Sequence, residues 1–141
     1  MKKFLLTMLL ISTVALFLAA CGGGDSSDSG EAADGAVGNA ANGEKLYNQA
    51  TIGSANAPGC ITCHSLEAGV VLVGPSHNGL GTRAATAVDG MTAEEYLTQS
   101  IKEPDAHITE GFTAGVMYQN YAQDIPNSQI NDIVAFLLTQ K

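Results

Sequence analysis

The segment Cys60-Ile61-Thr62-Cys63-His64 constrains this chain more than any other part of its sequence. Two cysteines separated by two residues, with a histidine directly after the second, are typical of covalent c-type haem attachment. On a helical turn, cysteines at this spacing can reach the two vinyl groups of one haem, and the following imidazole can lie over the iron. The sequence therefore predicts one haem c, bound through thioethers to Cys60 and Cys63, with His64 as an iron ligand.

Three other roles compete for this pair of cysteines. A thioredoxin-like redox pair belongs in a βαβ context, and the sequence has no such pattern. A structural zinc site needs four ligands, and only His77 and His107 remain to complete one. A disulfide between Cys60 and Cys63 leaves His64 without a role. Haem attachment accounts for all three residues together.

Residues 1–20 have the three parts of a secretory signal: Lys2 and Lys3, an apolar run from Phe4 to Leu18, and small residues at the end. The ending Leu18-Ala19-Ala20-Cys21 resembles a bacterial lipobox. That resemblance implies cleavage before Cys21 and a diacylglycerol on its sulfur, which would anchor the protein to a bilayer. An uncleaved transmembrane helix and a plain signal peptide are the alternatives, although the run is short for a spanning helix.

Residues 21–42 are predicted to form a flexible linker behind the lipid anchor. From Gly22 onward they are almost entirely Gly, Ser, Asp, Ala, Glu and Asn, and Val37 is the only large apolar residue. Such a segment buries too little surface to offset its loss of conformational entropy. We therefore expect a lipoprotein signal peptide over 1–20, the linker over 21–42 and one folded domain over 43–141.

The chain is acidic, with 6 Lys and Arg against 14 Asp and Glu and a net charge of −8. Loss of Lys2 and Lys3 with the signal would change the net charge to −10. This balance argues against a nucleic-acid partner, because such partners require many cationic contacts. It fits a redox protein partner with a basic docking face, or serves only to keep the protein soluble. The sequence shows no recognisable grouping of His with carboxylates for acid–base catalysis, so we expect no small-molecule substrate.

The folded part reads as mainly α-helical with long loops. A first helix is expected over 42–49, and Gly43 and Tyr47 are expected to pack against Phe136. A second helix should begin at Thr92, where Glu95 completes a capping box. Pro104 should stop this helix.

The last helix is expected from Asn127 or Ser128. Its apolar residues recur at helical spacing, with Phe136 just off the stripe; they are Ile130, Ile133, Val134, Leu137 and Leu138. The region 66–89 is rich in Gly and shows no helical period, and Val70–Val73 is expected to be a short extended segment.

Together these features resemble a class I cytochrome c over about residues 43–141. Small bacterial monohaem cytochromes, and the cytochrome domain of some cytochrome oxidase second subunits, are especially similar. The matching segments are Gly43-x-x-x-Tyr47, Cys60-x-x-Cys63-His64, Gly74-Pro75, Tyr96-Leu97…Ser100-Ile101, Gly111-Phe112…Gly115-Val116-Met117 and Val134-Ala135-Phe136-Leu137-Leu138. The resemblance implies an all-α fold, a small helical domain wrapped around one covalently bound haem.

The resemblance also implies roles for single residues. Met117 would be the second axial ligand, on a loop that closes over the haem, and its thioether would raise the reduction potential relative to a second imidazole. The backbone carbonyl of Pro75 would accept the Nδ1–H of His64 and orient the ring. The family usually has Pro directly after the ligand Met, where this chain has Tyr118.

Other residues compete with Met117 for the sixth position. Met117 could instead be a core methionine, the commoner role of Met. Met91, His77 and His107 are the rival ligands.

The function that the resemblance implies is electron transfer, not enzymatic catalysis. The protein would shuttle single electrons between respiratory or photosynthetic redox partners. It would work outside the cytoplasm, tethered to a bacterial membrane on the periplasmic or cell-surface side. The alternatives are a haem subunit of a larger oxidoreductase complex, or a haem-based sensor or catalyst with a labile sixth ligand.

Overall fold

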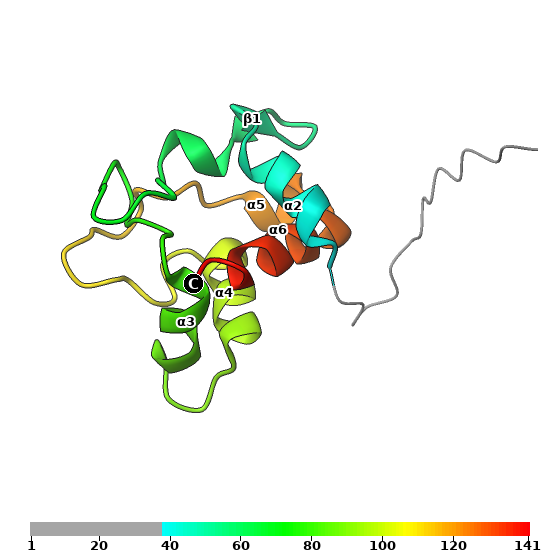
Figure 1. The fold of residues 1–141 in the computed structure, drawn as a ribbon. Helices are drawn as coiled ribbons and strands as arrows, with labels where there is room; N and C mark the ends of the chain where they lie inside the picture. The colour runs from blue at the N-terminus through cyan, green and yellow to red at the C-terminus, as the bar shows by residue number, and fades with distance from the viewer. Residues whose placement is uncertain (1–37) are drawn as a thin grey trace, which may run out of the picture. The chain divides into compact units, whose positions relative to one another are not determined.

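The computed structural model describes residues 38–141 of the chain (Figure 1). The predicted signal peptide, Cys21 and the linker up to residue 37 lie outside the described residues. Helices dominate the described part, and a two-stranded sheet is its one sheet. The elements are α2 (Ala40–Tyr47), β1 (Thr51–Ile52), β2 (Ala57–Pro58), η1 (Cys60–Thr62), α3 (Leu80–Arg83), η2 (Ala84–Thr86), α4 (Ala93–Lys102), α5 (Tyr121–Asp124) and α6 (Asn127–Leu138). This architecture confirms the predicted all-α fold class.

Helix α2 begins two residues earlier than predicted because Asn39 caps it. The Asn39 side-chain oxygen accepts hydrogen bonds from the backbone of Ala41 and Asn42, at 3.0 and 3.1 Å, as Asn does at helix N-caps. The Asn39 backbone in turn donates to the Asp132 carboxylate on α6, at 2.6 Å. The last residues of the predicted linker thus form the cap and first turn of α2.

Helices α2 and α6 make the closest contact in the domain, as the two lie side by side in Figure 1. Gly43 makes this approach possible, because a Cβ at that position would overlap the backbone carbonyl of Asp132. One turn on, Tyr47 packs on Phe136 with 5.3 Å between ring centroids. The predicted contact of Gly43 and Tyr47 with Phe136 is confirmed. Phe136 is buried although it lies off the main stripe, because it faces α2.

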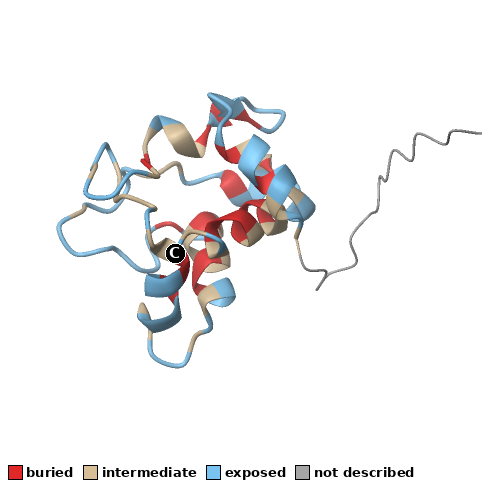
Figure 2. Ribbon diagram, in the orientation of Figure 1, coloured by how far each residue is buried: buried red, intermediate tan, exposed pale blue. Residues whose placement is uncertain are grey.

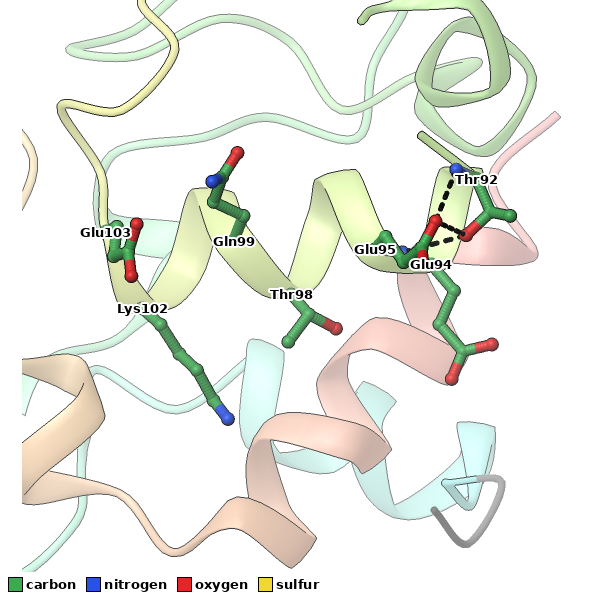
Figure 3. Close-up of a pocket in the computed structure, with 7 residues that line it drawn as sticks. All are labelled: Thr92, Glu94, Glu95, Thr98, Gln99, Lys102 and Glu103. Atoms are coloured by element: carbon green, nitrogen blue, oxygen red, sulfur yellow. Dashed lines mark hydrogen bonds between the residues drawn. The ribbon is translucent and has the colours of Figure 1, made fainter. Parts of the chain in front are cut away.

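Helix α4 packs its apolar side against α6. Its buried residues are Tyr96, Leu97 and Ile101. Figure 3 shows the capping box at its start, where the Glu95 carboxylate accepts the Thr92 backbone N–H at 2.8 Å. The Glu95 backbone donates to the Thr92 hydroxyl at 3.2 Å. The predicted start of this helix is confirmed, and it ends at Lys102, before Pro104.

Several short elements were not predicted. The hairpin of β1 and β2 lies between the first predicted helix and Cys60, where no element was predicted, and α3 and η2 lie in the Gly-rich region without helical period. Gly79 precedes α3 with a φ of 68°, a conformation that glycine adopts without strain. Gly81 then lets α3 approach the backbone of Leu138, and its N–H donates to the Gln140 carbonyl at 2.8 Å. Tertiary contact with the end of α6 therefore holds α3.

The prediction of an extended segment at Val70–Val73 was wrong. These residues form a loop, exposed from Val71 to Val73, with no strand partner among residues 38–141. Figure 2 shows this loop, and the long loop before α5, largely in the colour of exposed residues. Within the part of the chain that the structure describes, no helix has the length and apolar character to cross a bilayer.

Candidate functional site

The cysteine pair lies on a single 3-10 turn, η1, directly after the hairpin. Gly59 fixes the start of this turn, because its N–H donates to the Ala50 carbonyl at 2.9 Å. The Cys60 carbonyl then accepts from the backbone of Cys63 at 3.1 Å and of His64 at 2.9 Å. The two cysteines form no disulfide with each other, and burial raises the pKa of the Cys60 thiol to about 11. This turn gathers the two thiols and the imidazole along the wall of one cavity.

His64 is held through one of its two ring nitrogens. The ring is buried, 8% exposed, and Nδ1 lies 2.9 Å from the backbone oxygen of Pro75. Since a carbonyl only accepts, Nδ1 carries the proton and Nε2 keeps its lone pair. Burial lowers the pKa of His64 more than the hydrogen bond to Pro75 raises it, so the ring is neutral. A neutral imidazole with a free Nε2 is the form that binds a metal.

Gly74 leaves room for the His64 ring. A Cβ on Gly74 would clash with His64, at 2.8 Å from Nδ1. The Gly74 N–H donates to the Cys63 carbonyl at 2.9 Å, which ties this loop to the turn that carries the cysteines. The Gly74-Pro75 pair thus has two roles, since Gly74 leaves space for the His64 ring and the Pro75 carbonyl accepts a hydrogen bond from its Nδ1–H.

One cavity of about 780 Å³ joins these residues to distant parts of the chain. Cys60, Cys63 and His64 line it, and so does the half-buried Met117. Most of its other walls are apolar or aromatic, which is typical of cofactor sites; they include Leu80, Ala84, Ala87, Tyr96, Leu97, Ile101, Pro104, Ile108, Phe112, Val116, Tyr121, Ile133 and Leu137. The volume, the apolar lining and the grouped thiols and imidazole fit a covalently attached haem.

Hydrogen bonds before and after Met117 hold the loop that carries it. Before it, the Gly115 N–H donates to the Asp105 carboxylate at 2.8 Å. After it, the Gln119 side chain donates to the Met117 carbonyl at 2.8 Å. The Tyr118 hydroxyl donates to the Asp124 carboxylate on α5 at 2.5 Å. Where the family usually has Pro, Tyr118 therefore anchors the loop through its side chain.

The rival ligands are placed differently from Met117. The His77 ring stacks on the His64 ring, with 4.0 Å between centroids and 16° between planes. A ring in that position cannot lie on the opposite face of a haem from His64. His107 lines the cavity, as Met117 does, but it is exposed, and its ring contacts Tyr96 edge-on at 5.6 Å. Met91 is not among the residues that line the cavity.

A zinc site finds no support in the described part of the chain. Residues 38–141 contain no group of three or more His, Cys, Asp or Glu side chains that could hold a metal ion. Haem, by contrast, brings its own four nitrogen ligands and needs only axial donors from the protein.

Two parts of the site were not predicted from the sequence. Arg83 is the one Lys or Arg among the cavity-lining residues, and it donates to the backbone oxygens of Ser76, at 2.8 Å, and Asn78. As the one cation of this lining, Arg83 is the residue whose charge would pair with haem propionates, which are carboxylates. The pairing of His77 with His64 was also missed, since His77 was considered only as a rival ligand. A polar residue two positions after Gly74-Pro75 was the available signal.

Comparison with known families agrees with this geometry. Residues 40–141 match the family model described as cytochrome c. No curated protein and no solved structure is a significant match for the chain. The family match covers all the described elements, from α2 to the end of α6.

Proposed function

Because the chain belongs to the cytochrome c family, we propose that it is a membrane-tethered electron carrier whose single haem is ligated by His64 and Met117. Its family identifies it as a haem-binding electron-transfer protein, and Cys60 and Cys63 fit the covalent attachment of haem c. When bound, haem supplies a one-electron iron couple. The protein's own residues hold the group, orient its ligands and exclude water.

The observation that best supports this ligand pair is the shared cavity. His64 and Met117 are far apart in sequence, yet both side chains line it. The Pro75 carbonyl holds His64 with Nε2 free, and the bonds at Gly115, Gln119 and Tyr118 hold the Met117 loop. Two protein ligands leave no open coordination position for a substrate, so the site favours electron transfer over catalysis.

Spectroscopy of Met117→Ala tests the proposal. Met117 ligation should give the oxidised protein a weak far-red sulfur-to-iron charge-transfer band, and the reduced protein should not bind carbon monoxide readily. Met117→Ala should lose the band and bind carbon monoxide. Met91→Ala is the matched control, because Met91 does not line the cavity, and it should keep the wild-type spectrum. Survival of the band in Met117→Ala would exclude Met117 as the ligand.

We further propose that Cys21 carries the lipid anchor. The support is the Leu18-Ala19-Ala20-Cys21 sequence and the polar stretch that follows it. A diacylated Cys21 would keep the cytochrome domain at an extracytoplasmic membrane surface, within reach of membrane-bound redox partners. Mass spectrometry of the mature protein from membranes should find the N-terminus at Cys21 with a lipid mass added. An unmodified N-terminus elsewhere would reject the anchor.

A redox partner with an apolar contact and basic flanks would fit the cavity mouth. Val71, Leu72 and Val73 are 59%, 49% and 54% exposed, and Val73 lines the cavity. The charged residues of the segments 65–79 and 103–120 are all exposed and acidic, and they include Glu67 and Glu110. Redox complexes are small and transient, so an apolar centre with charged flanks suits fast association. Rising ionic strength should then slow electron exchange with such a partner.

A further inference from the structure

His77 is the side chain that covers the proposed iron ligand. The two imidazole rings stack in nearly parallel planes, 16° apart, with 4.0 Å between centroids. His77 is held there from its own backbone, because its N–H donates to the Ser65 carbonyl at 2.8 Å. Its carbonyl accepts from Leu80 at 3.0 Å. These two hydrogen bonds fix the backbone at His77, and with it the position from which the ring stacks on His64.

A buried hydrogen-bond chain links His77 back to the residue it covers. The Tyr47 hydroxyl lies 3.2 Å from His77 Nδ1 and 3.2 Å from the backbone oxygen of His64. The carbonyl can only accept, so Tyr47 donates to it, and His77 Nδ1–H then donates to the Tyr47 oxygen. This arrangement gives the Tyr47 hydroxyl both a donor and an acceptor, and Tyr47 is fully buried. Burial also raises the pKa of Tyr47, so its donor proton stays in place.

We infer that His77 is a positioning residue that fixes the plane of the His64 ring and sets the polarity next to it. The inference rests on the proposed function, since it takes His64 as the iron ligand. Pro75 holds one edge of the ring, but a single hydrogen bond leaves the ring free to pivot about it. The stacked His77 ring removes that freedom.

The same contact should lower the reduction potential. Oxidation places additional positive charge on the iron, part of which its imidazole ligand shares. The stacked His77 ring presents its π face to His64, and a polar aromatic face attracts positive charge more than an aliphatic side chain does. Polarity and hydrogen bonding around axial ligands are recognised controls of haem potential. Replacement of His77 by an aliphatic residue should therefore favour the reduced state.

The test compares His77→Leu, His77→Gln and Tyr47→Phe in the haem-loaded full chain. His77→Leu removes both the stacking ring and the polarity, while His77→Gln keeps a polar group that can reach Tyr47. Tyr47→Phe keeps the stacking and breaks the hydrogen-bond chain. Two quantities are measured in each: the midpoint potential, and the proton NMR shifts of the four haem methyl groups in the oxidised state. The methyl shifts report the orientation of the axial imidazole plane.

We expect His77→Leu to shift the midpoint potential to more positive values and to reorder the haem methyl shifts. His77→Gln should move the potential back toward that of the wild type. Tyr47→Phe should reorder the methyl shifts less than His77→Leu does. An unchanged potential and an unchanged methyl pattern in His77→Leu would overturn the inference, even if the variant were less stable. If His77→Leu takes up no haem, an unchanged haem methyl pattern in His77→Gln, which also lacks the stacking ring, would overturn the inference equally.

Failure of the proposed function would look different. It would appear in the wild type, as the lack of a low-spin, six-coordinate haem spectrum. A normal wild-type spectrum with no response to the His77 substitutions would reject the role of His77 alone.

Discussion

The backbone of Asp132 occupies the space that a side chain at position 43 would need. Alanine normally stabilises a helix interior relative to glycine by up to about 1 kcal/mol. At the crossing of α2 and α6 the sign should reverse, because the added methyl must push the two helices apart. We expect Gly43→Ala to lower the free energy of unfolding by about 1–3 kcal/mol, as overpacking does. Urea unfolding of the haem-loaded protein, followed by circular dichroism, measures this.

Asn42→Ala is the matched control for Gly43→Ala. It introduces the same residue one position earlier, where the side chain is exposed. Its stability should stay equal to that of the wild type or rise slightly. Equal effects of the two substitutions would contradict the close packing of α2 on α6.

Among single residues, those with a local signature could be predicted from the sequence. Cys60, Cys63 and His64 share one five-residue motif, and their joint position on the cavity wall follows from a single turn. His77 and Arg83 could not be predicted in the same way. Their positions depend on a loop whose path is set by contacts with Ser65, Tyr47 and the end of α6.

At the scale of elements, the capping box of α4 allows a second prediction. Thr92 and Glu95 satisfy each other's backbone N–H groups at the start of the helix. Thr92→Ala should lower the free energy of unfolding by about 1 kcal/mol, the usual effect of losing such a cap. Thr98→Ala on the same helix is the control, since Thr98 takes no part in the capping box (Figure 3). Chemical denaturation measures the free energy of unfolding of both variants, and only Thr92→Ala should show the loss.

The same box should give α4 a dependence on pH. Hydrogen bonds from the backbone and side chain of Thr92 lower the pKa of the Glu95 carboxyl below its ordinary value of 4.5. A carboxyl whose pKa is lower in the folded state stabilises the fold above its unfolded pKa, and that contribution disappears as pH falls through the folded pKa. The stability difference between wild type and Glu95→Gln, measured by denaturation across pH, should therefore be full near neutral pH. It should shrink below about pH 4.5. A difference that grows on acidification would contradict the box.

Long helices with caps and periodic apolar residues were predictable, and short elements were not. Helices α4 and α6 start where the sequence places them, because Thr92 and the Ile130–Leu137 stripe are local signals. The hairpin, α3, η2 and α5 have two to four residues each. Elements of that length have too few internal hydrogen bonds to form alone, so tertiary contacts decide them. One such contact is the bond from the Tyr121 hydroxyl to the Pro58 carbonyl at 2.7 Å, which joins α5 to the hairpin.

At the scale of the whole described domain, the single hydrophobic core has two parts, which differ in whether they line the cavity. One is the contact between α2 and α6, built from residues that do not line the cavity, such as Gly43, Tyr47, Ile130 and Phe136. The other surrounds the cavity of about 780 Å³, where α3, α4 and the loop before α5 have apolar walls. In a domain this small, a bound haem would supply much of the apolar contact area around the cavity. The stability of the cavity walls should therefore depend on bound haem more than the stability of the contact between α2 and α6 does.

A Cys60→Ser/Cys63→Ser variant, which cannot form the thioethers, tests that difference. Without haem, the apolar walls of the cavity are open to water, and residues 105–119 keep few backbone hydrogen bonds of their own. We expect fast amide hydrogen exchange in 105–119 and in α3, while amides of α2 and α6 at their crossing keep measurable protection. The haem-loaded wild type is the reference. Protection lost equally from all elements would show that the domain unfolds as one unit without haem, and that α2 and α6 have no stability of their own.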